Sequence, residues 1–409
     1  MKNKGIRLLL ILVILTTTLL NPFKVKAEPQ YVKAGTFIRQ LVQAMKLEVD
    51  KTSKLPYVDA ALKAGILKAN QFTDYEGYIT TVDAAVLLNI ADEYLYKDAL
   101  DEKLYKVVLE KRISDIKKIS KEKRGDVAKV VAKGIIKGYS NGKYIQNRAF
   151  KGNEYFTKED AKVALIRLMN PSKRAKLSPD GQLIRTTNLP KNADKYEYIL
   201  ECFPNSFYEK KFRYQRTKYH YKPKELVDYA NPVKVIGAMR SLTVIDGKMT
   251  YLNDWTDKVR LNLSTRLNVD YKTIEKNNTW LNNLSSTYYL FEKADLNKPL
   301  IDDIKEYIAF VKKNKVKIES EIISVEPSTL YYSTGYYMRV YAKFKVASPN
   351  FDKIKDDIIF YGYRADKKRL EEGNWMECVF DILLGTKNGN SKGRDYAVSG
   401  GGLIIVFED

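Results

Sequence analysis

The chain is poor in the side chains that most often carry metal or nucleophilic chemistry. Among 409 residues it has one histidine and two cysteines. A single histidine excludes three-histidine and His-Glu-x-x-His zinc sites, and a Ser-His-Asp or Cys-His arrangement would have to use His220. That histidine lies in the basic and aromatic stretch RTKYHYKPK, with no nucleophile motif beside it. We therefore expect a surface or packing role for His220, and neither a metal nor another cofactor.

Long apolar runs are equally scarce. The clearest one, 8–20, is shorter than the roughly 20 residues that a transmembrane helix needs. Basic residues precede it, and Val25 and Ala27 place small side chains at the two positions that a signal peptidase reads. This order predicts a secretory signal peptide at 1–27, cleaved after Ala27, and no integral membrane segment in the mature chain. An uncleaved N-terminal anchor is the alternative.

The sequence leaves open whether the two cysteines pair. Cys202 and Cys378 both lie in the second half of the chain, and secretion would expose them to an oxidising compartment. The spacing of two cysteines along the chain does not show how close they lie in the folded protein. A disulfide between them and two separate thiols are therefore both open.

Basic residues outnumber acidic ones. The chain has 71 Lys and Arg against 50 Asp and Glu, and removal of 1–27 takes away five bases and no acid, which leaves a net charge of +16. Nucleic acid is the usual partner of so basic a protein. Outside a bacterial cell the abundant polyanion is the wall itself, so for a secreted protein we expect wall association and no nucleic acid. Charge that only keeps the protein soluble is the alternative.

The N-terminal part contains a repeat. Residues 61–95 align with 131–169, and 31–47 is a partial third copy. Each full copy has a short helix that ends at Ala-Gly-Ile-Leu or Lys-Gly-Ile-Ile, a polar loop with glycine, and a second helix with an apolar face. Gly65 and Gly134 stand where a helix C-terminus favours a left-handed residue. Gly138 and Gly142 bracket the loop tip Tyr-Ser-Asn, a composition typical of turns.

The start of the second helix has its own signals. Thr80 and Thr157 can cap it by accepting hydrogen bonds from its free N–H groups. Asp83 and Asp160 fall in the first turn, where an acid complements the helix dipole. In the last copy, Ala161, Ala164, Leu165 and Leu168 then follow at helical spacing.

These residues resemble the S-layer homology domain of bacterial surface proteins. GIIKGYSNGKY at 134–144 is similar to the family's GIIxGxxxGxF, and FTKED at 156–160 to its helix start ITRAE, with Lys158 in the arginine place. The second copy reads ITTVD, with Thr81 in that place, and in the first copy Lys33 is the candidate basic residue. Asp115 matches the family's opening aspartate. The resemblance covers 30–175.

The resemblance implies a noncovalent wall anchor. In the family, three repeats pack as a pseudo-threefold helical bundle and bind a secondary cell-wall polysaccharide that often carries a pyruvylated sugar. The basic residue of the helix start pairs with the ligand's carboxylate, and a helix N-terminus beside a cation is a suitable anion site. The residues implied in binding here are Lys158, Thr157, Asp160, Lys33, Thr80, Asp83, Gly138 and Gly142.

Residues 190–409 show no family resemblance that we can name. Near-four-residue spacing in 255–267 and 301–311 predicts helices, and strict alternation from Met338 to Val346 predicts a half-buried strand. The predicted fold class is therefore multidomain, with an all-α repeat bundle followed by an α+β domain that has a mainly antiparallel sheet. The predicted boundaries are 28–175 for the repeats (28–50 partial, 51–96 and 112–172), 176–190 for a linker, and 191–409 for the α+β domain.

Together these features predict a secreted bacterial protein anchored at the cell wall, without enzymatic activity. A cell-wall glycan hydrolase and a structural subunit of a surface layer are the alternatives. For a hydrolase, adjacent acids such as Asp302 and Asp303, or Glu371 and Glu372, point in different directions on a regular element and form no evident catalytic pair.

Overall fold

The computed structural model describes residues 30–97, 100–211, 244–245, 248–249, 251–288, 293–332, 336–361, 370–385, 397–398 and 404–405. The chain divides into two compact units. The first holds the residues up to Tyr94 and Gly152–Asn170, and the second holds Leu95–Lys151 and Pro171–Asp409. This division differs from the predicted domain boundaries, because 95–151 and the predicted linker 176–190 both belong to the second unit. The predicted signal peptide and His220 lie outside the described residues.

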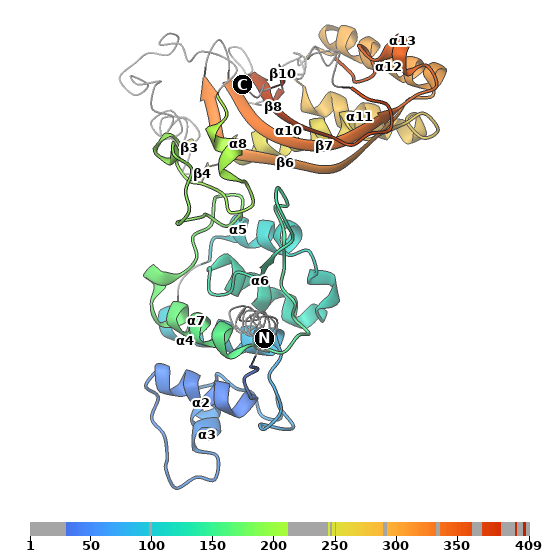
Figure 1. The fold of residues 1–409 in the computed structure, drawn as a ribbon. Helices are drawn as coiled ribbons and strands as arrows, with labels where there is room; N and C mark the ends of the chain where they lie inside the picture. Colours follow the sequence, from blue (N-terminus) through green and yellow to red (C-terminus); the bar gives the residue numbers. More distant parts are fainter. Residues whose placement is uncertain are drawn as a thin grey trace, which may run out of the picture. The chain divides into compact units, whose positions relative to one another are not determined.

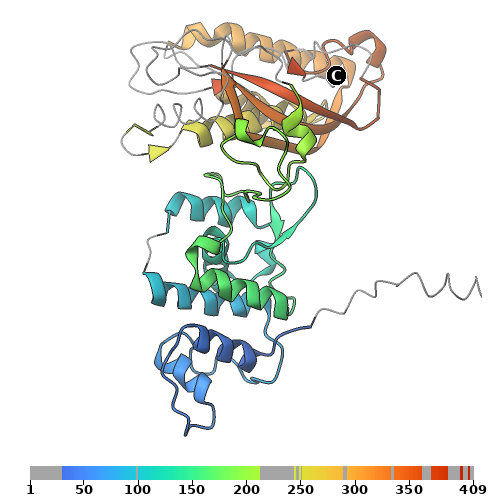
Figure 2. The ribbon, with the colours of Figure 1, turned by 60° about the vertical axis from the view of Figure 1, so that its left-hand side comes forward.

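The first unit is helical. It contains α2 (Ala34–Ala44), α3 (Pro56–Lys63), most of α4 (Thr81–Tyr96) and α7 (Lys158–Met169), and α2 and α3 lie side by side (Figure 2). The predicted apolar face of α7 is confirmed at Ala161, Ala164 and Leu168, which are buried, whereas Leu165 is half-buried.

The second unit begins with further helices. These are α5 (Glu102–Val107), continued by η1 (Val108–Arg112), then η2 (Ile116–Lys118), η3 (Lys121–Lys123) and α6 (Arg124–Ala132). A small hairpin of β1 (Tyr139–Ser140) and β2 (Arg148–Ala149) follows. Later short elements are η4 (Pro171–Lys173), η5 (Ala193–Lys195), α8 (Asn205–Glu209) and the pair β3 (Val244–Ile245) and β4 (Lys248–Met249).

Both predicted glycine helix ends are confirmed, one in each unit. Gly65 after α3 has φ +71° and Gly134 after α6 has φ +68°. In each case the next residue donates its N–H back across the last turn, from Ile66 to the Ala61 carbonyl at 3.0 Å and from Ile135 to the Val130 carbonyl at 2.9 Å. These are the bonds of a Schellman helix end.

The C-terminal part of the second unit is built on an antiparallel sheet, as expected. Its strand order is β10-β8-β7-β6-β5, and β9 also pairs with β8. The strands are β5 (Val269–Asp270), β6 (Lys317–Tyr332), β7 (Tyr336–Ala347), β8 (Met376–Gly385), β9 (Ala397–Val398) and β10 (Ile404–Ile405). In register, Val325 of β6 faces Val340 of β7, which faces Phe380 of β8.

Helices cover one face of this sheet (Figure 1). They are α10 (Tyr251–Arg266), α11 (Thr279–Thr287) and α12 (Lys298–Asn314), with η6 (Lys276–Asn278), η7 (Ala294–Asn297) and α13 (Phe351–Ile354) between or after them. The predicted spacing on α10 is confirmed, since Trp255, Val259, Leu263 and Leu267 are all fully buried against the sheet.

Part of the opposite face of the sheet is also buried, which the alternating pattern did not predict. Met338, Val340 and their alternating neighbours face the helices as expected, but Arg339 and Tyr341 on the other side are 0 % and 4 % exposed. An aromatic segment, 196–208, packs over Tyr341 and Val379 and forms a second core. The predicted half-buried strand is therefore buried on both faces at Arg339 and Tyr341, whereas Lys343 and Lys345 further along the same face are partly exposed, as predicted.

The loop between β1 and β2 contacts this same sheet. The ring of Tyr144 stacks on that of Tyr341 with centroids 3.5 Å apart, and the Gln146 side chain donates to the Val325 carbonyl at 2.8 Å. The Ser324 hydroxyl donates to the Tyr144 carbonyl. The polar loop of the last repeat copy is thus a packing element of the second unit.

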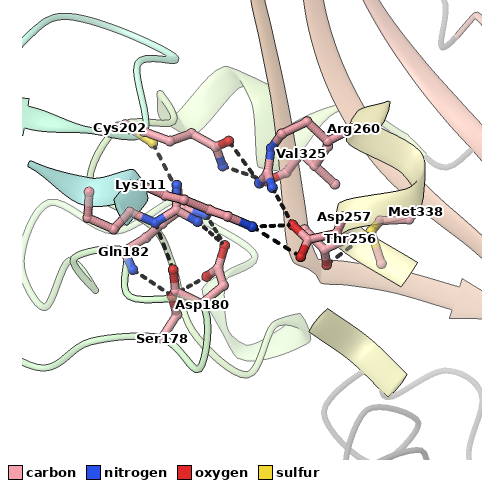
Figure 3. Close-up of polar contacts among 12 residues, drawn as sticks. Lys111, Ser178, Asp180, Gln182, Cys202, Thr256, Asp257, Arg260, Val325 and Met338 are labelled. Carbon is pink, nitrogen blue, oxygen red and sulfur yellow. Dashed lines mark hydrogen bonds and ion pairs between the residues drawn. The ribbon is translucent and has the colours of Figure 1, made fainter. Parts of the chain in front are cut away.

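A polar network ties the end of η1 to the predicted linker and to α10 (Figure 3). The buried Arg112 donates from Nε to the Asp180 carbonyl at 2.7 Å and from Nη2 to its carboxylate at 2.8 Å. The Ser178 hydroxyl and the Gln182 amide also donate to this carboxylate, at 2.6 and 2.7 Å. Beside it, Lys111 and Arg260 both pair with Asp257, at 3.2 and 2.8 Å.

The two cysteines do not pair. Cys202 and Cys378 form no disulfide with each other, so the disulfide alternative is not realised. Burial raises the pKa of the Cys202 thiol to about 12, which keeps it protonated at neutral pH. Within the described part of the chain, no helix is both long and apolar enough to cross a membrane.

Candidate functional site

Three helix starts meet in the first unit. The short extended segments 31–33, 78–80 and 155–157 precede α2, α4 and α7, and each pairs with the next through a single bridge. The N–H of Val32 donates to the Phe156 carbonyl at 3.0 Å, that of Phe156 to Ile79 at 2.9 Å, and that of Ile79 back to Val32 at 3.1 Å. The three bonds close a ring, so the helix starts are related by an approximate threefold axis.

The ring has an apolar side. Val32, Ile79 and Phe156 are at most 2 % exposed, and Phe156 makes an edge contact with Phe37 of α2 at 5.8 Å. Successive side chains of an extended segment point to opposite sides. The residues that precede these three therefore lie on the other side of the ring.

Those preceding residues are three tyrosines. In each pair of Tyr31, Tyr78 and Tyr155 the ring centroids lie 5.4 to 5.7 Å apart, and the rings meet edge-on or tilted. Tyr78 and Tyr155 are half exposed, at 51 % and 50 %. We call this cluster the tyrosine triad. It presents an aromatic surface to solvent at the axis where the three helices begin.

Two of the helices are capped as the sequence predicts. Thr80 accepts from the Asp83 N–H at 3.2 Å and donates its hydroxyl to the Asp83 carboxylate at 2.6 Å. Thr157 makes the same two bonds with Asp160, at 3.0 and 2.8 Å. Lys33, at the corresponding position of α2, provides no side-chain cap.

The hydrogen-bond ring also fixes which residues are equivalent. Because Val32 corresponds to Ile79 and Phe156, Lys33 corresponds to Thr80 and Thr157. Ala34 is then the counterpart of Thr81 and Lys158. The predicted equivalence of Lys33 with Lys158 is therefore wrong by one residue, since local sequence similarity in a partial copy does not define register.

The two lysines nevertheless both lie at helix starts. Lys158 donates its N–H to the Gln30 carbonyl at 2.8 Å and its Nζ to the Gln30 side chain at 3.1 Å. Lys33 pairs with the Glu76 carboxylate at 2.8 Å, and this hydrogen bond and charge raise the pKa of Lys33. Both ammonium groups are on exposed residues, so they are accessible from solvent.

Gly138 and Gly142 do not join these helix starts. They belong to the second unit, with φ values of +67° and +128°. A side chain at Gly138 would press on the Ala149 carbonyl, and Arg148 donates to the Lys137 and Gly138 carbonyls at 2.9 and 2.8 Å. The two glycines shape the β1–β2 hairpin and its contact with the sheet.

Asp115 forms hydrogen bonds to the backbone that follows the β1–β2 hairpin. Its carboxylate accepts the N–H groups of Phe150 and Lys151, at 2.7 and 2.8 Å. It therefore holds the chain just before residue 152, where the second unit ends and the first resumes.

Sequence reasoning missed the tyrosine triad, although a signal was present. A tyrosine stands two residues before the helix cap position in all three copies, but only the ring of backbone bonds makes these positions neighbours. No group of three or more metal-ligating side chains is found among the residues described.

Comparison with known proteins bears on the last repeat copy. No relative of this chain is found among curated proteins. The family model of the S-layer homology domain matches residues 112–162, within the predicted third repeat. The matched segment runs through α6, the β1–β2 hairpin and the start of α7. The chain therefore contains an S-layer homology domain, which implies a protein associated with the cell surface or the cell wall.

Proposed function

We propose that the protein is secreted and held noncovalently at the cell wall by its three helix starts, which bind an anionic secondary cell-wall polysaccharide. The α+β part is then displayed at the surface, and the protein has no enzymatic activity of its own. The family match supports wall anchoring. The strong excess of basic residues favours an anionic polymer.

The observation that carries the proposal is the convergence of three helix N-termini around the tyrosine triad. Aligned peptide dipoles give each N-terminus a partial positive charge, which attracts anions. Lys158 and Lys33 add full charges at the rim, and lysine acts as a point charge rather than a bidentate fork. Tyrosine offers an apolar face with a polar end, which suits a sugar ring with its hydroxyl groups.

The whole mature chain is the right material for a test. Residues 95–151 and 171–175 pack in the second unit, so a fragment ending at 175 would expose surfaces that are buried in the intact protein. The mature chain should sediment with walls that carry their polysaccharide and remain in the supernatant with walls stripped of it.

The sharpest variant is Lys158→Ala. Loss of one accessible charge contact should weaken wall binding about fivefold at low salt, and less at high salt. Lys162→Ala removes an exposed lysine one turn further along α7 and should bind like the unmodified protein. Equal binding by both variants would show that Lys158 takes no part.

Two measurements address the alternative functions. Release of dye from labelled wall material would indicate a glycan hydrolase, and we expect none. Extended two-dimensional arrays from the purified protein would indicate a structural surface-layer subunit, whereas an anchored protein should remain dispersed in solution.

A further inference from the structure

One edge of strand β6 is only partly covered by its neighbours. On that side β5 pairs with β6 at Lys317 and Ile318 alone, and within the described residues no other strand or single bridge continues the pairing. The uncovered edge of a strand presents a row of backbone N–H and C=O groups. An edge of this kind can accept one further strand, whose main chain then pairs with it.

Two amide side chains mark the ends of the uncovered stretch. The N–H of Ser320 donates to the Asn268 side-chain oxygen at 3.1 Å, and the Asn268 amide donates to the Ser320 hydroxyl at 2.7 Å. At the other end, the Gln146 amide donates to the Val325 carbonyl at 2.8 Å. The stretch between these two contacts is 321–324.

The same contacts show which backbone groups point to the uncovered side. The N–H and C=O groups of one strand residue point to the same side, and this side alternates along the strand. Because Gln146 binds the Val325 carbonyl on the uncovered side, both groups of Ile323 point there as well. Ser320 also faces that side, because the register with β7 shifts by one residue between Ser320 and Ile322. The stretch therefore offers one donor and one acceptor at Ile323.

A groove of about 640 Å³ runs along this stretch. Helix α10 covers one face of the sheet, and the β1–β2 loop packs on the other face through Tyr144 and Tyr341. Ile323 is half-buried in the groove, whereas Ala342, its partner on β7, is fully buried. A single extended chain fits between the two walls, but a second whole sheet does not. The lining residues are 321–324 of β6, 144–147 of the loop, Asp257, Arg260, Leu261 and Ser264 of α10, and Lys111 and Arg112.

Both walls of the groove offer apolar surface. Leu261 of α10 is 36 % exposed, and Ile145 of the loop is half-buried. Side chains of an added strand would face α10 and the loop in turn, because they alternate along it. A strand with an apolar side chain at every second position would therefore bury these side chains against the loop wall.

The α10 wall carries surplus positive charge. Lys111 and Arg260 share the one carboxylate of Asp257, at 3.2 and 2.8 Å (Figure 3), so two positive charges meet a single negative one. An acidic side chain on the partner would compensate the remaining charge. The other charged residues of the groove have their own ion-pair partners, which are Asp180 for Arg112 and Lys343 for Glu321.

We propose that this edge binds an extended peptide segment of another protein, which adds a short strand to β6 and directs an acidic side chain toward α10. The partner's main chain accepts the Ile323 N–H and donates to the Ile323 carbonyl. So short a stretch makes few backbone bonds, so the complex is weak and reversible. The interaction is independent of the wall-binding proposal, because every residue of the groove lies in the second unit, away from the three helix starts.

Ligand-observed NMR on the full mature chain tests the proposal with three synthetic peptides. Acetyl-Thr-Val-Glu-Val-Thr-amide has the alternation and the acid that the groove requires, and it should bind. The same peptide with its three central nitrogens methylated cannot donate to the strand edge and should not bind. Replacement of its glutamate by lysine should weaken binding about fivefold. Equal binding of the methylated peptide, or no binding of the first peptide, would overturn the proposal.

Variants then locate the peptide. Leu261→Glu places a negative charge in the groove and should weaken binding of the acidic peptide roughly tenfold. Leu296→Glu changes a leucine of η7 that is 54 % exposed and lies outside the groove, and it should bind the peptide normally. Ile323→Pro removes the N–H on the uncovered side, a change that strand edges tolerate, and should abolish binding. Undiminished binding in Leu261→Glu would refute the site even if the proline variant did not fold.

Sedimentation velocity separates a peptide partner from a second copy of the chain. The purified protein should remain monomeric at the concentrations used for NMR. A concentration-dependent dimer that Leu261→Glu abolishes would assign the edge to a second copy and overturn the proposal. Sedimentation with polysaccharide-bearing walls should be normal in Leu261→Glu, because the altered residue lies in the second unit.

Discussion

Arg112 and Asp180 form a buried ion pair that joins the first residue of the family-matched segment to the segment predicted as a linker. The guanidinium Nη2 lies 2.8 Å from the carboxylate, and both side chains are less than a tenth exposed. The pair helps to hold the first part of the last repeat copy in the second unit. Its first part is fixed to the C-terminal part by buried charge, whereas α7 packs with α2.

Asp180→Ala should strongly destabilise the second unit. Removing one member of a buried pair leaves an uncompensated charge, which costs about 3–5 kcal/mol. All three tryptophans lie in this unit, so urea unfolding followed by tryptophan fluorescence reports on it directly. Asp257→Ala breaks a pair whose carboxylate side chain is 53 % exposed and should cost less than about 1 kcal/mol. Similar losses for both variants would contradict the prediction.

Gly134→Ala should cost more stability than Gly65→Ala. The two positions have nearly the same left-handed φ. Backbone strain should therefore lower the free energy of unfolding by about 1 kcal/mol in both variants. A methyl group at Gly134 would also collide with the backbone of Ala175, whereas nothing lies within 4 Å of one at Gly65. Thermal unfolding followed by far-ultraviolet circular dichroism should rank the variants in that order. The reverse order would mean that the chain at 175 moves away freely.

Glu326 should make the second unit less stable as the pH rises above 5. This side chain is fully buried, and burial raises the pKa of its carboxyl group to about 8. Between its unfolded pKa and 8 the folded state holds a proton that the unfolded state has lost. Stability therefore falls with rising pH, by at most about 1.4 kcal/mol per unit, and levels off above 8.

The matched variant for this effect is Glu326→Gln, which keeps an acceptor for the Ser328 hydroxyl, now 2.6 Å from the Glu326 carboxylate. Urea midpoints for both proteins from pH 5 to 8 should show a shallower decline in the variant. Because other groups can also titrate between pH 5 and 8, the difference between the two proteins is the quantity to compare. Identical slopes would show that Glu326 is ionised in the folded protein at neutral pH.

The tyrosine triad should contribute to wall binding. Tyr78→Ala or Tyr155→Ala removes one half-exposed ring and should weaken sedimentation with polysaccharide-bearing walls roughly fivefold, equivalent to about 1 kcal/mol. Tyr94 belongs to the same unit and is 49 % exposed, close to the 51 % of Tyr78. Tyr94→Ala is therefore a matched control that should bind normally. A loss in the control alone would place the polymer elsewhere on the unit.

Much of the local structure could be predicted from sequence. Thr80 and Thr157 cap their helices, and Gly65 and Gly134 end theirs, because these features depend on residues within one turn. The buried face of α10 and the inner face of β7 follow from periodicity, which reports which side chains avoid water. The equivalence of Lys33 with Lys158 failed because register depends on partners distant in the chain.

By itself the sequence determined where helices begin and end, which faces are apolar, and that one segment is of the S-layer homology type. Only the tertiary structure decided that three helix starts meet around three tyrosines, and that the β1–β2 loop packs on the C-terminal sheet. It also decided that Arg112 and Asp180 form a buried ion pair. The physical reason is the same in each case: capping and periodicity are properties of neighbouring residues, whereas the closure of a ring, the burial of a second sheet face and the partners of a charge depend on long-range packing.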